Sequence, residues 1–448
     1  MKAQIHQKYH DALQGEGDSL ESRLIEHEEA LMRLKRIAKW KKREKFTIVF
    51  LCYSPAMWRS LQSVYEAFAA DDDFNVTILA LPYKCGNNFI DEGAYTFFSG
   101  LSYNVVDGYD KQTGQWRNLC CFEPDFVFFQ TPYDSARYAD EYLVEKVAQY
   151  TAIGYVHYAI GGLSGNATYT RSFASHCSLN FVETESRRDV VLEHIRCVDT
   201  PRARQVCFTG HPKLDFLHED HVQGAGPWKI PDENGLFRIL WLPRWSNGEG
   251  CCFFPDYKDA LLAYMQQHTD MELAFRPHPL ALRTYVERNI LTEEQLRRYI
   301  DTYATSDRAV LDTAADYLPT FFSSSVLVAD YTSLMAEYIF TGKPIIYCHR
   351  TPVFNKDFQQ LAQGFYWAQD WRELEKTLDM LRNGEDPLAE RRRELAASLF
   401  HRPPGGAGSL IKKLVKLYLT GNWDPGLANG ERLFAENVPE EIIQPQAM

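Results

Sequence analysis

Hydrophobic positions along the chain fall into short runs that alternate with polar, helix-like stretches. Between residues 46 and 217, runs rich in Val, Ile, Phe and Tyr read as buried strands at 46–52, 74–82, 125–130, 152–156, 178–183 and 205–210. Stretches with apolar residues at helical spacing lie between them, at 57–70, 135–150 and 186–195. Strands that alternate with helices in this way predict a parallel, doubly wound sheet.

The pattern stops after this region and then starts again. Residues 218–235 are polar, contain several Gly and Pro residues and show no periodicity, which is typical of a linker. Further strands are expected at 236–243, 271–279, 308–312, 325–330 and 343–348, with helices at 257–268, 280–302, 333–342 and between 371 and 419. We therefore expect an α/β protein with two facing Rossmann-like domains and a ligand cleft between them, at the carboxyl ends of the strands.

The expected boundaries follow from this pattern. We predict a basic helical arm at 1–45, an N-terminal Rossmann-like domain at 46–217, a linker at 218–235, a C-terminal Rossmann-like domain at 236–420 and an irregular tail at 421–448.

The arm ends in a strongly basic segment. Eight of the thirteen residues from 33 to 45 are Lys or Arg, and Leu34, Ile37, Ala38 and Trp40 are interleaved among them. One interpretation is an amphipathic helix that lies on anionic lipid, as a peripheral contact with the membrane. The alternative is a helical arm that packs on its own domain or on a second subunit.

Composition narrows the class of protein. The chain has 448 residues, a formal net charge of −12 and 45% hydrophobic residues, so it has enough apolar residues for large cores. It shows no apolar run long enough to cross a bilayer and no secretory signal at its start, so we expect a cytoplasmic protein. The negative charge argues against a nucleic-acid partner. The ten Cys residues include no C-x-x-C pair, which argues against structural zinc, and Cys52 and Cys348 read as small core residues.

Candidate chemistry is concentrated at the ends of the predicted strands. The strand at 325–330 ends in Asp330, and Thr332 and Ser333 then precede a helix that carries Glu337. Free backbone N–H groups at such a helix start suit a phosphate or pyrophosphate. The other interpretation is an ordinary N-cap, with Glu337 in a capping box.

Two more strand ends of the second half carry cationic or aromatic groups. Arg276 and His278 lie in a proline-stiffened turn, where Arg offers a planar fork for phosphate oxygens and His a proton or hydrogen bond. Arg244 is a further phosphate candidate, and Trp245 beside it can stack on a base or fill core.

In the first half, His157 follows a buried strand directly. It is either a general base or a structural histidine that bonds a loop carbonyl. Lys213, in the turn 209–215, can reach an anion, and Asp215 can start a helix. The chain contains no P-loop, nucleophile elbow, H-E-x-x-H or G-x-G-x-x-G motif, which removes support from P-loop ATPases, serine hydrolases, zinc peptidases and dinucleotide oxidoreductases.

Taken in order, these motifs resemble the CDP-glycerol glycerophosphotransferase family of teichoic-acid primases and polymerases. The family pattern is a histidine motif, G-x-P-[RK]-x-D, a strand ending in P-[TR]-W, R-x-H-P, and a strand–D-Y-[ST]-S–helix–K-P-[IV]-I unit. This chain has His157, GHPKLD at 210–215, LPRW at 242–245, RPHP at 276–279 and VADYTSLMAEYIFTGKPIIY at 328–347. The resemblance covers roughly residues 45–415.

The resemblance implies a GT-B fold, with the acceptor on the N-terminal domain and the nucleotide donor on the C-terminal one. It implies transfer of a glycerophosphate or related polyol phosphate from CDP-glycerol or another CDP-polyol to a hydroxyl of a lipid-linked or glycan acceptor, without a cofactor or metal, in the cytoplasm or on the inner face of the membrane. By the same resemblance His157 and His278 are catalytic. Donor contacts are expected from Arg276, Asp330, Thr332, Ser333, Glu337, Lys213 and Arg244.

One departure keeps alternatives open. The family's histidine motif is H-G-[ST]-P-[LI]-K, whereas Tyr158, Ala159 and Ile160 follow His157 here. A GT-B glycosyltransferase that uses a nucleotide sugar for capsule or lipopolysaccharide, with Glu337 on sugar or ribose hydroxyls, fits the same cleft. A non-catalytic binding subunit and a nucleotide-sugar epimerase are further alternatives.

Overall fold

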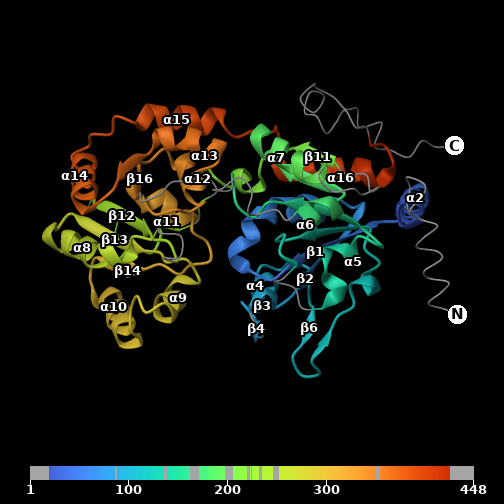
Figure 1. Cartoon of the computed structure of the whole chain (residues 1–448), viewed down its shortest axis with the longest axis horizontal. Helices are drawn as coiled ribbons and strands as arrows, with labels where there is room; N and C mark the ends of the chain where they lie inside the picture. Colours follow the sequence, from blue (N-terminus) through green and yellow to red (C-terminus); the bar gives the residue numbers. More distant parts are fainter. Residues whose placement is uncertain are drawn as a thin grey trace. The chain divides into compact units, whose positions relative to one another are not determined.

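In the computed structural model, the described residues are 20–85, 88–134, 139–161, 171–196, 205–218, 222, 224–231, 235–245, 252–348 and 354–423. The chain divides into two compact units (Figure 1). The first unit takes the described residues of 1–158, 166–213 and 402–448, and the second takes those of 159–165 and 214–401.

The first unit is built on a parallel seven-stranded sheet of order β11-β10-β9-β8-β1-β2-β5. Its strands are β1 (Phe46–Cys52), β2 (Phe74–Ala80), β5 (Val105–Asp107), β8 (Phe126–Phe129), β9 (Ala152–Val156), β10 (Leu179–Val182) and β11 (Gln205–Phe208). Its helices are α2 (Leu20–Lys41), α3 (Gln62–Ala69), α4 (Ala94–Gly100), α5 (Val144–Val147), α6 (Arg171–His176), α7 (Glu185–Arg196) and α16 (Gly406–Thr420). Two short hairpins, β3 (Tyr83–Cys85) with β4 (Asn88–Ile90) and β6 (Tyr109–Asp110) with β7 (Gln115–Trp116), complete it.

Alternate residues of these strands feed two cores. Phe50 and Phe128 stack in the core that α3, α4 and α16 cover. Val49 and Tyr155 point into the other core, under α5, α6 and α7. Burial of both faces explains why the strands read as continuous apolar runs.

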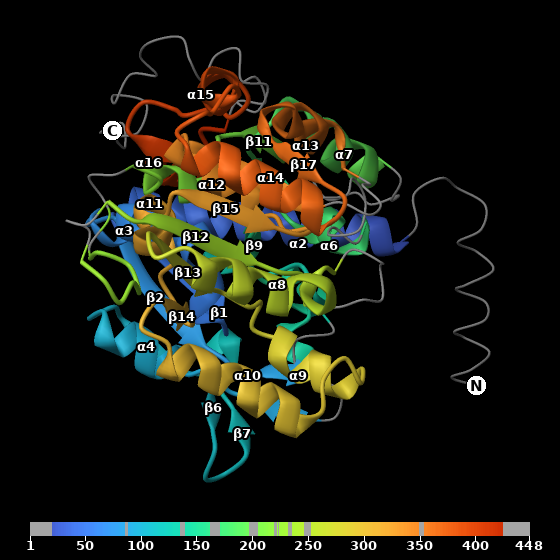
Figure 2. The same ribbon diagram turned by 90° about the vertical axis from the view of Figure 1, so that its left-hand side faces the viewer.

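The second unit contains a parallel six-stranded sheet of order β14-β13-β12-β15-β16-β17 (Figure 2). Its strands are β12 (Phe237–Leu242), β13 (Met271–Phe275), β14 (Ala309–Leu311), β15 (Val326–Ala329), β16 (Ile345–Cys348) and β17 (Tyr366–Ala368). One face packs on α8 (Phe254–Gln267), α9 (Ala281–Glu287), α10 (Glu293–Thr305) and α14 (Trp371–Arg382). The other packs on α11 (Leu318–Ser323), α12 (Met335–Tyr338), α13 (Lys356–Leu361) and α15 (Ala389–Ser398).

The predicted α/β class and parallel sheets are confirmed, but several predicted helices are shorter or divided, and two of them show why. The helix expected at 135–150 reduces, within the described residues, to a 3₁₀ turn and α5, which begins where the Asp134 carboxylate accepts the N–H of Val144 at 3.1 Å. The helix expected at 280–302 splits into α9 and α10. Thr292 and Gln295 form a capping box at the start of α10, and this fixes a new N-terminus.

The unit boundaries also differ from the expected ones. The sequence pattern assigns residues up to 420 to the second domain. Helix α16 nevertheless packs on α3 in the first unit, because Ile411, Leu414 and Val415 are buried in the core under β1. The two helices lie so close that a Cβ on Gly408 would be 2.5 Å from the backbone of Ser63. Helix α16, the last helix among the described residues, therefore completes the first unit (Figure 1).

The segment predicted as a linker is partly fixed to the second unit. The buried carboxylate of Glu272 accepts the backbone N–H groups of Lys229 and Ile230 at 2.9 and 3.0 Å, while it pairs with Arg238 at 3.0 Å. Trp228 donates its indole N–H to Ser323 at 2.7 Å. Residues 228–230 thus form a strap along the sheet of the second unit.

The arm helix α2 packs on the first unit. Lys39 pairs with Asp125 at 2.6 Å, Trp40 stacks on Phe46 at 6.0 Å, and the guanidinium of Arg36 lies 5.2 Å from the ring of Tyr418 in α16. This supports the interpretation of an arm that packs on its own domain.

Candidate active site

The strand order of the second unit places a ligand site between β12 and β15. The chain runs outward from β12 through β13 to β14, and then from β15 through β16 to β17 on the other side. Open α/β sheets bind ligands where the order reverses, outside the carboxyl ends of the strands. Arg244 follows β12, and Asp330, Thr332 and Ser333 follow β15, so these four residues lie at that position.

Asp330 holds the two strand ends together. It is fully buried, and its Oδ2 accepts the backbone N–H of Arg244 at 2.8 Å and of Phe253 at 2.9 Å. A buried carboxylate that takes backbone hydrogen bonds is well stabilised. Asp330 therefore fixes the loop that carries Arg244 against the loop that carries Ser333.

Arg244 connects the parts of the site. Its guanidinium donates to the backbone carbonyl of Tyr331 at 2.8 Å and lies 5.1 Å from the Tyr331 ring centre. Its own carbonyl accepts the hydroxyl of Tyr285 at 2.7 Å. These contacts hold a cation beside the turn that contains Thr332 and Ser333.

His278 lies on the opposite side of Arg244, after β13. Desolvation of the ring, and then the positive charge of Arg244, lower the pKa of His278 to about 4. Its Nδ1 accepts the N–H of Leu280 at 3.1 Å, so the neutral ring carries its proton on Nε2. The side chain of His278 is exposed to solvent, so its Nε2–H is free to meet a ligand as a hydrogen-bond donor, and its catalytic role stays a prediction.

The turn after β15 does not form the expected N-cap. Helix α12 begins at Met335 with Leu334 at its N-cap position and without a side-chain cap. The hydroxyl of Thr332 instead accepts the N–H of Leu334 at 3.4 Å, inside the turn. Among the described residues, no side-chain hydrogen bond of Ser333 is found, so its hydroxyl can take a ligand.

Glu337 and Arg276 are held by protein partners. Glu337 is fully buried and accepts the hydroxyl of Tyr317, so the predicted capping box is wrong. Arg276 pairs with Asp312 at 2.8 Å, donates to the carbonyl of Ala314 at 2.6 Å and lies over the Tyr317 ring. In this structure both residues brace the edge of the sheet, and their contact with a donor stays a prediction.

The candidate residues of the first unit form a second, separate group. His157 follows β9 and is buried, and His211, which follows β11, donates from Nε2 to the His157 carbonyl at 2.6 Å. The N–H of Lys213 donates to His211 Nδ1 at 3.2 Å. The backbone of Lys213 is therefore held by a histidine of the first unit, and the contact of its side chain with a donor stays a prediction.

Tyr158 shapes the surroundings of His157. The two rings stack at 4.9 Å, and the Tyr158 hydroxyl lies 3.1 Å from that of Tyr133. A large ring thus covers His157 at the position where the family motif has Gly.

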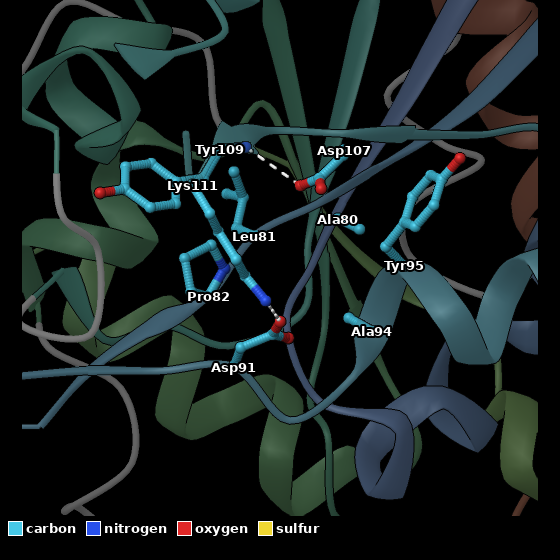
Figure 3. Close-up of a pocket in the computed structure, with 9 residues that line it drawn as sticks. All are labelled: Ala80, Leu81, Pro82, Asp91, Ala94, Tyr95, Asp107, Tyr109 and Lys111. Carbon is cyan, nitrogen blue, oxygen red and sulfur yellow. Dashed lines mark hydrogen bonds and ion pairs between the residues drawn. The ribbon is translucent and has the colours of Figure 1, made fainter. Parts of the chain in front are cut away.

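The first unit also has a small, open pocket at the carboxyl ends of β2 and β5. Lys111 reaches across it to Asp91 at 2.5 Å, Asp107 accepts the N–H of Tyr109 at 3.2 Å, and Tyr95 lies at its rim (Figure 3). Three strand spacings separate β2 from β9 in the sheet, which is about 14 Å. The pocket is therefore a separate feature from His157.

Within the described part of the chain, no group of His, Cys, Asp or Glu is arranged to hold a metal ion. In the same residues, no helix has the length and apolar character needed to span a membrane. Cys52 and Cys348 are buried, as the sequence predicts.

His211, Asp312 and Tyr317 hold site residues in place but are not among the candidates predicted from the sequence. For His211 a signal was present, since it follows a predicted strand on the same sheet edge as His157. Asp312 carries a similar signal, because it ends the predicted strand 308–312. No signal marked Tyr317, whose contacts depend on the tertiary fold.

Comparison with known proteins gives a family match in sequence. Residues 196–367 match the family described as CDP-Glycerol:Poly(glycerophosphate) glycerophosphotransferase. The teichoic acid ribitol-phosphate polymerase TarK of Staphylococcus aureus is 25% identical over 194 residues, which is 41% of this chain. The match spans 35% of the length of TarK.

Solved structures share the fold. The wall teichoic acid polymerase TagF superposes with a TM-score of 0.51 at 13% identity, covering 90% of this chain and 98% of that one. The UDP-GlcNAc 2-epimerase of Neisseria meningitidis, bound to UDP-GlcNAc, superposes with a TM-score of 0.53 at 15% identity. The superposition covers 84% of this chain and 99% of the epimerase. The chain is thus similar, in sequence over residues 196–367 and in its GT-B-like α/β fold, to the CDP-glycerol glycerophosphotransferase family.

Proposed function

We propose that this protein transfers a glycerophosphate or related polyol-phosphate group from a CDP-linked donor to an acceptor hydroxyl, with release of CMP. The observation that carries the proposal is the arrangement around Arg244, where a cation lies between the neutral donor His278 and the turn of Ser333 at the reversal point of the second sheet. The sequence match over 196–367 supports the same chemistry.

The chemical step is a displacement at phosphorus. The acceptor hydroxyl oxygen attacks the phosphorus that bears the polyol, a new P–O bond forms, and the bond to the bridging oxygen breaks, so that CMP leaves with the electron pair. His157 takes the proton of the acceptor hydroxyl. Phosphoryl transfer depends chiefly on positioning and charge neutralisation.

Each donor-side group then has a role. We assign the charge of Arg244, the Nε2–H of His278 and the hydroxyl of Ser333 to the pyrophosphate oxygens of the donor. Because Nδ1 of His278 accepts a backbone N–H, its Nε2–H can donate a hydrogen bond to the leaving phosphate. Thr332 and Asp330 keep the turn in shape.

The acceptor and the location belong to the same proposal. We propose a lipid-linked or glycan acceptor and a place of action in the cytoplasm, at the inner face of the membrane. The basic residues between 33 and 45 support a peripheral membrane contact, because several of them, Arg33, Lys35, Lys41, Lys42, Arg43 and Lys45, are exposed.

Turnover of defined donors tests the proposal. The protein is incubated with CDP-glycerol, CDP-ribitol and a panel of nucleotide sugars, with and without acceptor, and the free nucleotide is identified. We expect CMP from a CDP-polyol only. Release of a nucleoside diphosphate from a sugar donor would assign the protein to the nucleotide-sugar glycosyltransferases, and donor binding without turnover would make it a binding subunit.

A further inference from the structure

Helix α2 presents two different faces. Arg36 is buried and Ile25, Met32 and Trp40 are partly buried on the side that packs on the first unit. The opposite side is exposed along its length and includes Leu24, Leu31 and Leu34, with 59%, 54% and 64% of their surface exposed. Among the described residues, exposed large hydrophobic side chains otherwise occur one at a time, at Tyr95, Leu101, Leu280 and Trp367.

The exposed leucines have the spacing of a coiled-coil seam. Leu24, His27, Leu31, Leu34 and Ala38 follow one another at intervals of three, four, three and four residues, and all five are exposed. Such a repeat places side chains in the a and d positions of heptads, along one stripe of the helix. A helix that only covers its own domain needs no second stripe on its solvent side.

We propose that this stripe, residues 24, 27, 31, 34 and 38 of α2, pairs with the same stripe of a second copy of the chain as a parallel coiled coil. Charged residues beside the stripe favour a second copy as the partner. With the leucines at a and d, Arg23 occupies a g position and Glu28 the following e position, so in a parallel pair each Arg23 faces Glu28 of the other copy. An antiparallel pair centred on Leu31 would instead place Glu28 opposite Lys35 of the other copy, so the two orientations give different results when Arg23 and Glu28 are exchanged.

The pairing is expected to be weak, because the seam is short and contains a polar residue. His27 lies at a d position, and its Nδ1 donates to the carbonyl of Arg23 at 2.7 Å on its own helix. A polar residue in the seam fixes the register and lowers the affinity. We therefore expect a reversible dimer. The inference is independent of the proposed catalytic function.

Sedimentation equilibrium of the full chain over a range of concentrations tests the proposal. We expect a monomer–dimer equilibrium, and Leu31→Glu should raise its dissociation constant by at least about tenfold, because each copy loses a buried leucine. Arg33→Gln, at an exposed position of α2 away from the stripe, is the matched control and should leave the constant unchanged. His27→Leu should lower the dissociation constant of the dimer by a similar factor.

Charge reversal tests the orientation. Arg23→Glu and Glu28→Arg should each weaken the dimer, and the double variant should restore it, which only the parallel register predicts. A monomer at all concentrations, or a mass that Leu31→Glu does not change, would overturn the proposal. If Leu31→Glu instead abolishes flotation with vesicles of anionic phospholipid while the mass stays the same, the stripe binds lipid and the proposal is wrong.

Discussion

His211 donates a hydrogen bond from Nε2 to the backbone carbonyl of His157, across 2.6 Å and 54 positions of sequence. The acceptor is the main chain of the residue that we propose as the base, so the contact fixes where the loop after β9 lies. Since the Lys213 N–H occupies Nδ1, the tautomer of His211 is also fixed.

The first prediction distinguishes the hydrogen bond from His211 to the His157 carbonyl from the packing of the His211 ring. Gln can place an amide N–H near the position of imidazole Nε2, whereas Asn is too short to do so. We expect His211→Asn to lower kcat by about tenfold to a hundredfold, as a misplaced reacting group does, and His211→Gln to stay close to the parent. The KM for the donor should not change in either variant, because the donor contacts belong to the second unit. Equal activity of the two variants would contradict the positioning role.

Donor-side variants should act on turnover. His278→Ala and Ser333→Ala each remove one hydrogen-bond donor, and single donors of this kind are worth roughly 10²–10³ in rate, so we expect a loss of about tenfold or more in kcat. CMP release from CDP-glycerol is the measurement. Asp316→Asn, outside the proposed contacts, serves as the control. Near-normal turnover in both alanine variants would remove these residues from the site.

Acid should weaken the first unit through His211. Complete burial, with Lys213 next in importance, lowers the pKa of His211 to about 3. The unfolded chain, with an ordinary histidine pKa of about 6.5, binds the proton more readily, so stability is full above pH 6.5 and falls as the pH drops towards 3. At pH 5 the free energy of unfolding is expected to be lower by about 2 kcal/mol than at pH 7.

Denaturant unfolding at pH 7 and pH 5 checks this prediction. His211→Gln removes the titrating group and should make the difference between the two pH values smaller. An unchanged difference in that variant would show that other groups cause the acid sensitivity.

Helix α16 should tolerate no side chain at Gly408. A Cβ there would lie 2.5 Å from the carbonyl carbon and oxygen of Ser63, and neither backbone atom can move away cheaply. We expect Gly408→Ala to cost about 1–3 kcal/mol of stability, the usual range for overpacking. Gly100→Ala is the control, since a Cβ at that helical glycine meets nothing within 4 Å. Thermal unfolding of both variants is the measurement, and only Gly408→Ala should lower the unfolding temperature. An equal unfolding temperature in the two variants would contradict the prediction.

Membrane contact can be tested without cutting the chain. Deletion of 1–45 would remove the Lys39–Asp125 ion pair and the stacking of Trp40 on Phe46, and so damage the first unit. Exchange of the exposed Lys35, Lys41, Lys42 and Arg43 for Gln removes charge alone. We expect less pelleting with anionic liposomes, since each basic residue near such a surface contributes about 1 kcal/mol. Unchanged pelleting would refute the role of the basic segment.

Much of the fold could be predicted from local pattern. The strands at 46–52 and 152–156 are found at the predicted residues, because buried parallel strands are apolar throughout. The same pattern predicts the site positions Arg244 and Ser333, since both lie in the loops that follow buried strands.

The side-chain partners could not be predicted in this way. Glu337 looked like a cap, and its burial against Tyr317 depends on α11 and α12, which pack together only in the folded unit. The pairing of Arg276 with Asp312 needs the β13–β14 register. The position of α16 was missed because an amphipathic helix does not reveal which sheet it covers.

The return of α16 to the first unit sets an order of events on the ribosome. The second unit is continuous apart from residues 159–165 and can bury its core while synthesis is still under way. The first unit begins earlier but lacks the helix that covers Phe50 and Phe128 until residue 420 has emerged. The half that is made first is therefore finished last, and until then it exposes an apolar face that a chaperone would have to shield.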